Sequence, residues 1–254
     1  MEKRKIRIFN IEYSKAEKEK ILGYFREVID EAFLTNHTFC KRLEGAFEDI
    51  CKPYKAISCS SATAGLEAVF RFLKVDNKAV LVQSNTFVAT AHAIQAAGGV
   101  VVPIDLNEEF VMSVDDLKIA VNESKERGLD IGAVCIVNIA GRASSELIAI
   151  QEFCKNRNYK LVEDNAQGML STLNQQQLGT FSDFSVSSFQ TTKVVACGEG
   201  GIILVKDSKN FQALKNFIFY GRDENVPLLY SEVSGNFKLS ELNAALALAD
   251  FERS

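Results

Sequence analysis

The sequence predicts an α/β fold built on a mostly parallel sheet that helices cover on both faces. Two observations predict this class. Short β-rich runs alternate with helical stretches along the chain, and these runs are apolar throughout instead of alternating apolar with polar residues. Such strands are buried on both sides, which requires helices above and below the sheet. The 254 residues, 47% hydrophobic and 24% charged, also have the composition of an ordinary globular protein.

The chain is predicted to begin with helices. Between Lys15 and Phe33 apolar residues recur every three or four positions, which indicates an amphipathic helix. A second helix is expected near Phe39 to Cys51. The runs that follow are KAISC, AVLVQ and VVVPI as strands, with ATAGLEAVFRFL and TFVATAHAIQAA as the helices between them. This alternation predicts β-α-β units.

The same alternation continues through the middle of the chain. Ser113, with Asp116 three residues later, resembles a capping box and predicts the start of a helix. The strand GAVCIV, a helix from about Ser144 to Arg157 and the strand YKLVE follow. These segments extend the predicted sheet by two strands.

Past Asp164 the pattern becomes more polar. The segment STLNQQQLGTFSD leads to FSVSSF, a Gly-rich CGEGG and the strand IILV, which indicates loops and strands over a site. Helices are expected from Phe211 to Phe219 and from Leu239 to the last residues, with an irregular stretch from Gly221 to Asn236 between them. The absence of repeats and of a Pro/Gly/Ser-rich linker predicts one continuous domain.

Charge, cysteine and histidine content argue against several classes of function. The net charge is −4 and no basic block follows the MEKRK start, so a nucleic-acid or membrane partner is not expected. The six cysteines form no CxxC pair and read as reduced core residues. Two histidines without ligand spacing predict no metal site. Without an apolar leader or an 18-residue apolar window, the chain is expected to be cytoplasmic.

Residues suited to binding a ligand follow several predicted strands, and ligands of open parallel sheets gather at the carboxyl ends of strands. The segment Ser60 to Thr63 follows KAISC and begins a helix, so its hydroxyls and N–H groups suit an anion such as phosphate. Phe87 follows AVLVQ, where an aromatic ring is placed to stack on a flat cofactor. Asp164 and Gln167 follow YKLVE, where a buried carboxylate calls for a cationic partner.

Taken alone, each feature has an ordinary structural interpretation: a helix cap, a core ring, a turn carboxylate. Lys193, in SSFQTTKVVACGEGG, is by itself most simply a solvated surface charge. A lysine beside a buried site, however, becomes an imine-forming nucleophile. The joint set, with Ser188 five residues before Lys193, meets the needs of pyridoxal phosphate: a phosphate cradle, a ring-stacking aromatic, a partner for the ring nitrogen and an amine.

These segments resemble the DegT/StrS family of nucleotide-sugar aminotransferases, which have the pyridoxal-phosphate fold type I. The similar segments are SCSSATAGLEAVF, SNTFVATAHAI, VVPIDL, LVEDNAQG, SGNFKLSELNAALALADFE and, most specifically, SSFQTTKVVACGEGGIILV. The resemblance runs nearly end to end over the large domain. It implies that residues 1–254 form one large cofactor-binding domain, with an N-terminal helical arm (1–35) and an α/β core (36–254).

The resemblance also implies a role for each matching residue. Lys193 would hold pyridoxal phosphate as a Schiff base, and Asp164 would pair with the ring nitrogen. Ala62, Thr63 and Ser188 would bind the phosphate. Phe87 would stack on the cofactor ring, and Gln167 would contact the phenolic oxygen side of the cofactor. Asn236 would reach the neighbouring subunit's cofactor.

The implied function is ping-pong transfer of an amino group from glutamate to a nucleotide-diphosphate keto sugar, by a homodimer, in amino sugar and polysaccharide biosynthesis. Gln83, Asn138 and Lys238 depart from the family's usual proline, histidine and arginine, which leaves the acceptor sugar open. Members of the family continue into a smaller C-terminal domain, which we expect this chain to lack, either as a truncated chain or as a naturally short relative.

Three alternatives compete with this interpretation. A non-catalytic relative that serves as a binding or regulatory protein is disfavoured by Asp164, Ser188 and Lys193, all of which are intact. The related sugar dehydratases have histidine in place of the lysine, so Lys193 argues against them. A dinucleotide-dependent oxidoreductase would need GxGxxG after an early strand, whereas CGEGG has the wrong spacing and comes late.

Overall fold

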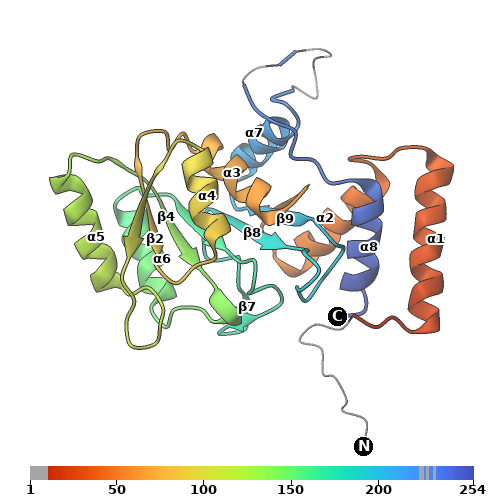
Figure 1. Ribbon diagram of the computed structural model, residues 1–254, viewed down its shortest axis with the longest axis horizontal. Coiled ribbons are helices and arrows are strands. Elements are labelled where there is room, and N and C mark those ends of the chain that lie inside the picture. The colour runs from red at the N-terminus through yellow and green to blue at the C-terminus, as the bar shows by residue number, and fades with distance from the viewer. Residues whose placement is uncertain (1–10, 223–225, 227–228, 231–232) are drawn as a thin grey trace, which may run out of the picture.

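The centre of the molecule is a seven-stranded sheet with helices on both faces (Figure 1). The computed structural model describes residues 11–222, 226, 229–230 and 233–254. In the strand order β1-β9-β8-β5-β4-β2-β3, β9 runs against both of its neighbours and the other adjacent strands are parallel. The predicted mostly parallel sheet is confirmed. The strands are β1 (Lys55–Cys59), β2 (Ala79–Gln83), β3 (Val100–Ile104), β4 (Ile131–Val137), β5 (Leu161–Asp164), β8 (Phe184–Ser188) and β9 (Gly201–Val205).

One face of the sheet is covered by α3 (Ala62–Phe72), α4 (Val88–Ala96) and α7 (Ser208–Ile218). Alternate residues of a strand point to the same face, so these helices share an apolar cluster with every second residue of the strands. α3 and α4 connect β1 to β2 and β2 to β3 as β-α-β crossovers. Their amino ends therefore lie at the carboxyl edge of the sheet.

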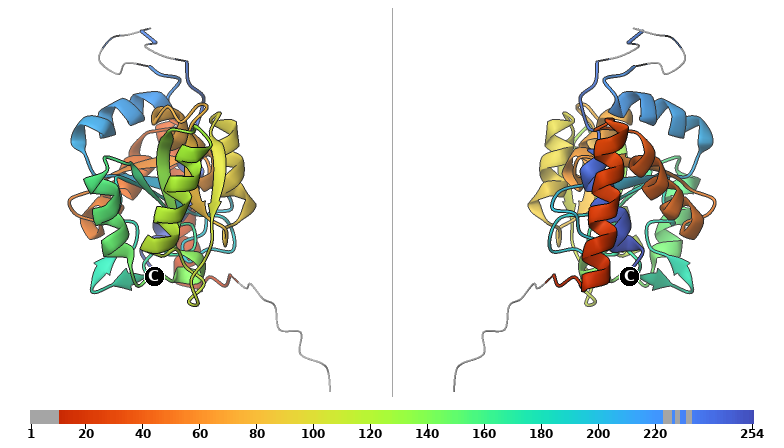
Figure 2. Two further views of the ribbon diagram at one scale, coloured as in Figure 1. Left: turned by 90° about the vertical axis from the view of Figure 1, so that its left-hand side faces the viewer. Right: turned by 90° about the vertical axis from the view of Figure 1, so that its right-hand side faces the viewer.

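The other face is covered in two halves. α2 (Thr38–Ile50) and α8 (Glu241–Phe251) pack against β1 and β9, whereas α5 (Val114–Glu126) and α6 (Leu147–Asn156) pack against β2, β4 and β5. α1 (Lys15–Glu31) lies outside α8 at one end of the molecule, as the right-hand view of Figure 2 shows. The helices cover both faces, as the apolar strands require.

Two predicted helix starts were wrong by three residues. α6 begins at Leu147 and not at Ser144, because Ser144 donates its hydroxyl to the carbonyl of Met112 (2.7 Å) and accepts the N–H of Glu146 (3.1 Å) in a turn. α7 begins before the predicted Phe211, because Asp207 caps it by accepting the N–H of Lys209 (2.8 Å).

The last helix was expected to run to the final residues. It ends instead at Phe251. Beyond it, the N–H groups of Arg253 and Ser254 donate to Asp250 and Phe251 in tight turns. A small hairpin that the sequence analysis did not predict joins β6 (Thr172–Leu173) to β7 (Gln176–Gln177). A short 3-10 helix, η1 (Ile139–Gly141), follows β4.

All six cysteines are free and buried, which confirms the prediction of reduced core residues. Among the described residues, no helix combines the length and apolar character needed to cross a membrane. The division into an arm (1–35) and a core (36–254) stays a prediction. Its first ten residues lie outside the described part of the chain, as do 223–225, 227–228 and 231–232 of the predicted irregular stretch.

Candidate active site

A cavity of about 510 Å³ opens where β1, β5 and β8 end, at the carboxyl edge of the sheet. This is the edge at which parallel α/β sheets bind their ligands. Seven of the eight predicted site residues line it: Ala62, Thr63, Phe87, Asp164, Gln167, Ser188 and Lys193. The chain therefore brings together side chains that are up to 131 positions apart, counted from Ala62 to Lys193.

The amino end of α3 forms one wall of the cavity. Ser61 caps this helix, with Oγ accepting the N–H of Ala64 (3.1 Å) and its carbonyl accepting that of Gly65 (2.9 Å). The first N–H groups of a helix have no acceptor within it, so those of Ala62 and Thr63 remain for a ligand. The helix dipole adds positive potential there, which suits a phosphate.

The first residue of β9, Gly201, packs closely against this helix start. A Cβ added to Gly201 would lie 2.8 Å from the backbone nitrogen of Ala62 and 2.9 Å from the carbonyl oxygen of Ser187. Only glycine permits this approach. The Gly-rich turn noted in the sequence thus ends in a residue that sets the position of the anion-binding wall.

Asp164, the last residue of β5, is 5% exposed and lines the cavity. Its Oδ2 accepts the hydroxyl of Thr90 (2.6 Å), and its Oδ1 accepts the N–H of Ala166 (3.1 Å). Burial raises the pKa of Asp164, while these two hydrogen bonds and the charge of Lys193 oppose that rise. A carboxylate desolvated in this way favours a cationic partner in the cavity.

Gln167 is fixed by a contact that the sequence did not indicate. Its Oε1 accepts the N–H of Ala140 at 2.9 Å, where the backbone of Ala140 has a positive φ of 51°. With its oxygen engaged, the side chain keeps its Nε2 donor for another acceptor, and Gln167 lines the cavity. A donor here fits the predicted contact with the phenolic oxygen side of the cofactor.

Lys193 and Ser188 belong to β8 and the turn that follows it. The N–H of Lys193 donates to the carbonyl of Gln190 (2.9 Å), and Ser188 Oγ accepts the N–H of Gln190 (3.2 Å). The side chain of Lys193 is half-buried and shares the cavity with Asp164. An amine, a buried carboxylate and a phosphate-sized donor set thus share one cavity.

The two outer predicted residues differ in placement. Phe87, the N-cap of α4, is 67% exposed, so its ring forms an open wall of the cavity and is not a core residue. Asn236 is exposed, pairs with Phe219 in an isolated bridge and does not line this cavity. Its contact with a neighbouring subunit's cofactor stays a prediction.

Two of the departures from the family pattern lie beneath the cavity and not on its wall. Gln83 is fully buried and accepts the N–H of Val137 (3.1 Å). Asn138 is also fully buried and donates to Glu163 (3.0 Å) and Asn165 (2.9 Å). Both side chains are enclosed by protein, and neither lines the cavity.

Two residues at the site were not predicted from the sequence. Glu199 lines the cavity, and its signal was its place in CGEGG, two residues before Gly201. Thr90 bonds to Asp164 from α4. Thr90 lies three residues after Phe87, a spacing that places both on one side of a helix start. This spacing alone did not identify Thr90 as a site residue, because a threonine is an ordinary residue in an apolar helix.

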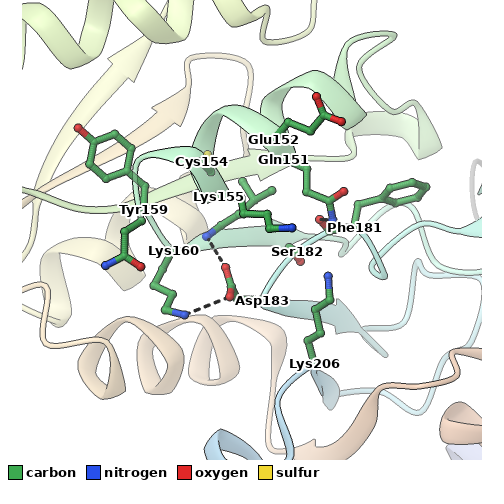
Figure 3. Close-up of a pocket in the computed structure, with 12 residues that line it drawn as sticks. Gln151, Glu152, Cys154, Lys155, Tyr159, Lys160, Phe181, Ser182, Asp183 and Lys206 are labelled. Carbon is green, nitrogen blue, oxygen red and sulfur yellow. Dashed lines mark hydrogen bonds and ion pairs between the residues drawn. The ribbon is translucent and has the colours of Figure 1, made fainter.

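A second cavity of about 540 Å³ lies at the opposite edge, beside the amino ends of β5 and β8 (Figure 3). There Asp183 pairs with Lys160 Nζ (3.1 Å) and accepts the N–H of Leu161 (3.0 Å), so its carboxylate is held at the first residue of β5. None of the predicted site residues lines this cavity. The candidate active site is therefore the cavity at the carboxyl edge.

Comparison with known proteins gives a family match over almost the whole chain. The model of the DegT/DnrJ/EryC1/StrS aminotransferase family matches residues 15–254. EpsN of Bacillus subtilis (strain 168) is 30% identical over 199 residues, which is 78% of this chain and 51% of EpsN. A UDP-4-amino-4,6-dideoxy-N-acetyl-beta-L-altrosamine transaminase of Campylobacter jejuni (serotype O:23/36) is 27% identical over 76% of this chain and 51% of its own length.

A similar fold is found in solved structures. NtdA from Bacillus subtilis, with the cofactor PMP bound, superposes with a TM-score of 0.84 at 22% identity, over 99% of this chain and 57% of NtdA. At this identity the likeness shows the fold, which is the predicted fold type I. The chain spans about half the length of the curated relatives it matches.

Proposed function

Because the chain belongs to the DegT/DnrJ/EryC1/StrS aminotransferase family, we propose that it is a pyridoxal phosphate-dependent enzyme that transfers an amino group from glutamate to a nucleotide-linked keto sugar. The family depends on pyridoxal phosphate, as the sequence predicted. The observation that carries the proposal is that Lys193 and Asp164 line one cavity whose far wall is the amino end of α3.

The residues present fit the cofactor. The N–H groups of Ala62 and Thr63, with Ser188 Oγ beside them, suit a phosphate. Asp164 suits a protonated ring nitrogen, because a buried carboxylate is stabilised by a cation. Phe87 offers an exposed ring for stacking. Each of these residue roles is part of the proposal.

Lys193 performs the covalent step and the proton transfers. Its Nζ would hold the cofactor, and once the amine of the donor had displaced it, the free Nζ would serve as the general base at the donor Cα. The same amine would then serve as the general acid that delivers the proton to the cofactor carbon. When bound, pyridoxal phosphate supplies an electron sink for this chemistry. Asp164 supports that sink by keeping the ring nitrogen protonated.

Substrates and partners follow from the resemblance and the relatives. One relative is named as a transaminase of a UDP-linked amino sugar, which supports a nucleotide-linked sugar as acceptor here. We propose a homodimer in which Asn236 reaches the neighbouring subunit's cofactor, and a cytoplasmic location. Exposed Asn236 is free to face a partner, since it does not line its own chain's cavity.

The test is to add pyridoxal phosphate to the purified protein, record its visible absorbance, reduce with borohydride and map the modified peptide. We expect one adduct, on Lys193, and bleaching of the band when glutamate is added. The matched control is Lys206→Ala, which removes a lysine of the second cavity and should change nothing, whereas Lys193→Ala should abolish the adduct. An adduct elsewhere, or none, would contradict the proposal and favour a non-catalytic binding or regulatory protein.

A further inference from the structure

Two threonine hydroxyls connect the rim of the candidate active site to its buried carboxylate. Thr90, in the first turn of α4, is fully buried, and its Oγ1 lies 2.6 Å from Asp164 Oδ2. Thr86, one turn earlier, is partly exposed, and its Oγ1 lies 2.7 Å from Thr90 Oγ1. The three side chains form one hydrogen-bonded row.

The direction of these hydrogen bonds follows from the groups involved. An ionised carboxylate only accepts hydrogen bonds, so the hydroxyl proton of Thr90 points at Asp164. Thr90 Oγ1 is then left as an acceptor, and Thr86 donates to it. Ala166 donates its N–H to the other carboxylate oxygen at 3.1 Å. Both oxygens of Asp164 are therefore held, which fixes the plane of the carboxylate.

Other charged and titratable groups near Asp164 do not replace this contact. Lys193 faces it across the cavity and acts through its charge, which opposes the rise in the pKa of Asp164. Cys135, on β4, is a buried thiol whose pKa is raised by burial and by the charge of Asp164. Glu163, the preceding residue of β5, points to the opposite face of the sheet and accepts the N–H groups of Gly179 and Phe181.

We propose that Thr90 is a positioning residue for Asp164: its hydroxyl, oriented by Thr86, holds the carboxylate ionised and in one orientation toward the ring nitrogen of the cofactor. This inference rests on the proposed function. Thr90 is fully buried and does not line the cavity, so it acts through Asp164. Its place in the first turn of α4 adds the favourable end of a helix dipole to the same carboxylate.

The test compares Thr90→Val, which keeps the shape and removes the hydroxyl, with Thr90→Ser, which restores it. In the protein without cofactor, the pKa of Asp164 is measured by carbon-13 NMR, with its resonance assigned from Asp164→Asn. In the protein with cofactor, the dissociation constant of pyridoxal phosphate is measured by absorbance. We expect Thr90→Val to lower the affinity for pyridoxal phosphate by about tenfold or more, because it removes a hydrogen bond to a charged group.

We expect Thr90→Val to raise the pKa of Asp164 and to weaken cofactor binding, and Thr90→Ser to restore both. Thr86→Val, which removes only the orienting donor, should give a smaller change of the same sign and serves if Thr90→Val does not fold. The matched control is Thr180→Val, since Thr180 is a buried threonine whose hydroxyl bonds within its own loop, to Gln177. It should lower stability without moving either readout.

The two proposals fail in different ways. If the wild-type protein binds no pyridoxal phosphate, the proposed function is wrong, whereas the pKa of Asp164 in the cofactor-free protein still tests the role of Thr90. If Thr90→Val binds the cofactor as tightly as the wild type and leaves the pKa of Asp164 unchanged, the positioning role is overturned. The positioning role is also overturned if Thr90→Ser restores neither the pKa nor the affinity.

Discussion

Asp250 lies 54 residues after Ala196 in the chain, yet its Oδ2 accepts the backbone N–H of Ala196 at 2.8 Å. Asp250 is fully buried in the last turn of α8, and its other oxygen accepts Nε of Arg253 (2.6 Å). Ala196 is three residues after Lys193, in the turn that carries the proposed nucleophile. The final helix of the described chain therefore anchors the active-site turn.

Asp250→Ala should loosen this turn and weaken cofactor binding. The change leaves the buried N–H of Ala196 without an acceptor, which costs about 1–3 kcal/mol. We expect a lower unfolding temperature and slower formation of the Lys193 adduct. Arg253→Gln is the matched control, because it spares the bond to Ala196 and should keep the rate of adduct formation. Equal rates in Asp250→Ala and the wild type would contradict the anchoring role.

Gln167→Glu should weaken binding of the cofactor and leave the local structure unchanged. A carboxylate oxygen still accepts the N–H of Ala140, so the fold of η1 is retained. The donor Nε2 is replaced by a negative oxygen, which repels the phenolic oxygen of the cofactor, and we expect affinity to fall by about tenfold. Gln167→Ala should lose both contacts and also lower the unfolding temperature. The prediction is wrong if Gln167→Glu binds pyridoxal phosphate normally.

Local sequence signals were enough to predict most of the fold. Apolar runs such as AVLVQ and helix caps such as Ser61 act over a few residues, so the elements that they form can be predicted from the sequence alone. The reversed direction of β9 was not predictable in this way, because IILV is apolar whether it runs with or against β8. Direction depends on how the chain crosses the sheet.

The site was predictable where one residue type marks a strand end, as with Asp164. It was not predictable where a contact joins distant segments. The bonds from Thr90 to Asp164 and from Asp250 to Ala196 span 74 and 54 positions, and nothing in the local sequence shows that these residues pair. The family resemblance supplied the roles of Lys193 and Gln167, whereas the fixing of Gln167 by Ala140 required the structure.

Asp164→Asn should stabilise the cofactor-free protein at neutral pH. Burial raises the pKa of Asp164 in the folded state, so folding favours the protonated form. That contribution is fully present below the ordinary pKa of about 4 and is lost as the pH rises through the folded-state pKa. Urea unfolding should therefore give equal stabilities for the two proteins at low pH and a more stable variant at pH 7. A variant less stable than the wild type at pH 7 would contradict this sign.

The native thiols should react slowly with Ellman's reagent at pH 8. Burial raises the pKa of Cys51 to about 11 and those of Cys59, Cys154 and Cys197 to about 12. The thiolate is the reactive form, so both burial and protonation protect it. All six cysteines should react at once after unfolding in guanidinium. Ser208→Cys, at an exposed position, should add one fast thiol to the native protein.

Glu241, a buried carboxylate, should be costly to remove by a single change. It is 1% exposed and accepts the N–H groups of His37 (2.6 Å), Phe39 (2.6 Å) and Cys40 (3.2 Å) at the amino end of α2. His37, the N-cap of that helix, makes no capping bond with its own side chain, so a residue of α8 supplies the cap.

Glu241→Ala leaves these buried N–H groups unpaired and should lower the free energy of unfolding by roughly 2–4 kcal/mol. Glu241→Gln retains one acceptor oxygen but loses the charge that favours a helix amino end, so its stability should fall between those of Glu241→Ala and the wild type. Glu123→Ala, at an exposed position of α5, should change stability by less than about 0.5 kcal/mol. Urea titration of all three variants tests the cap: if Glu241→Ala unfolds at the urea concentration of Glu123→Ala, the cap contributes nothing and α2 is held by its apolar face alone.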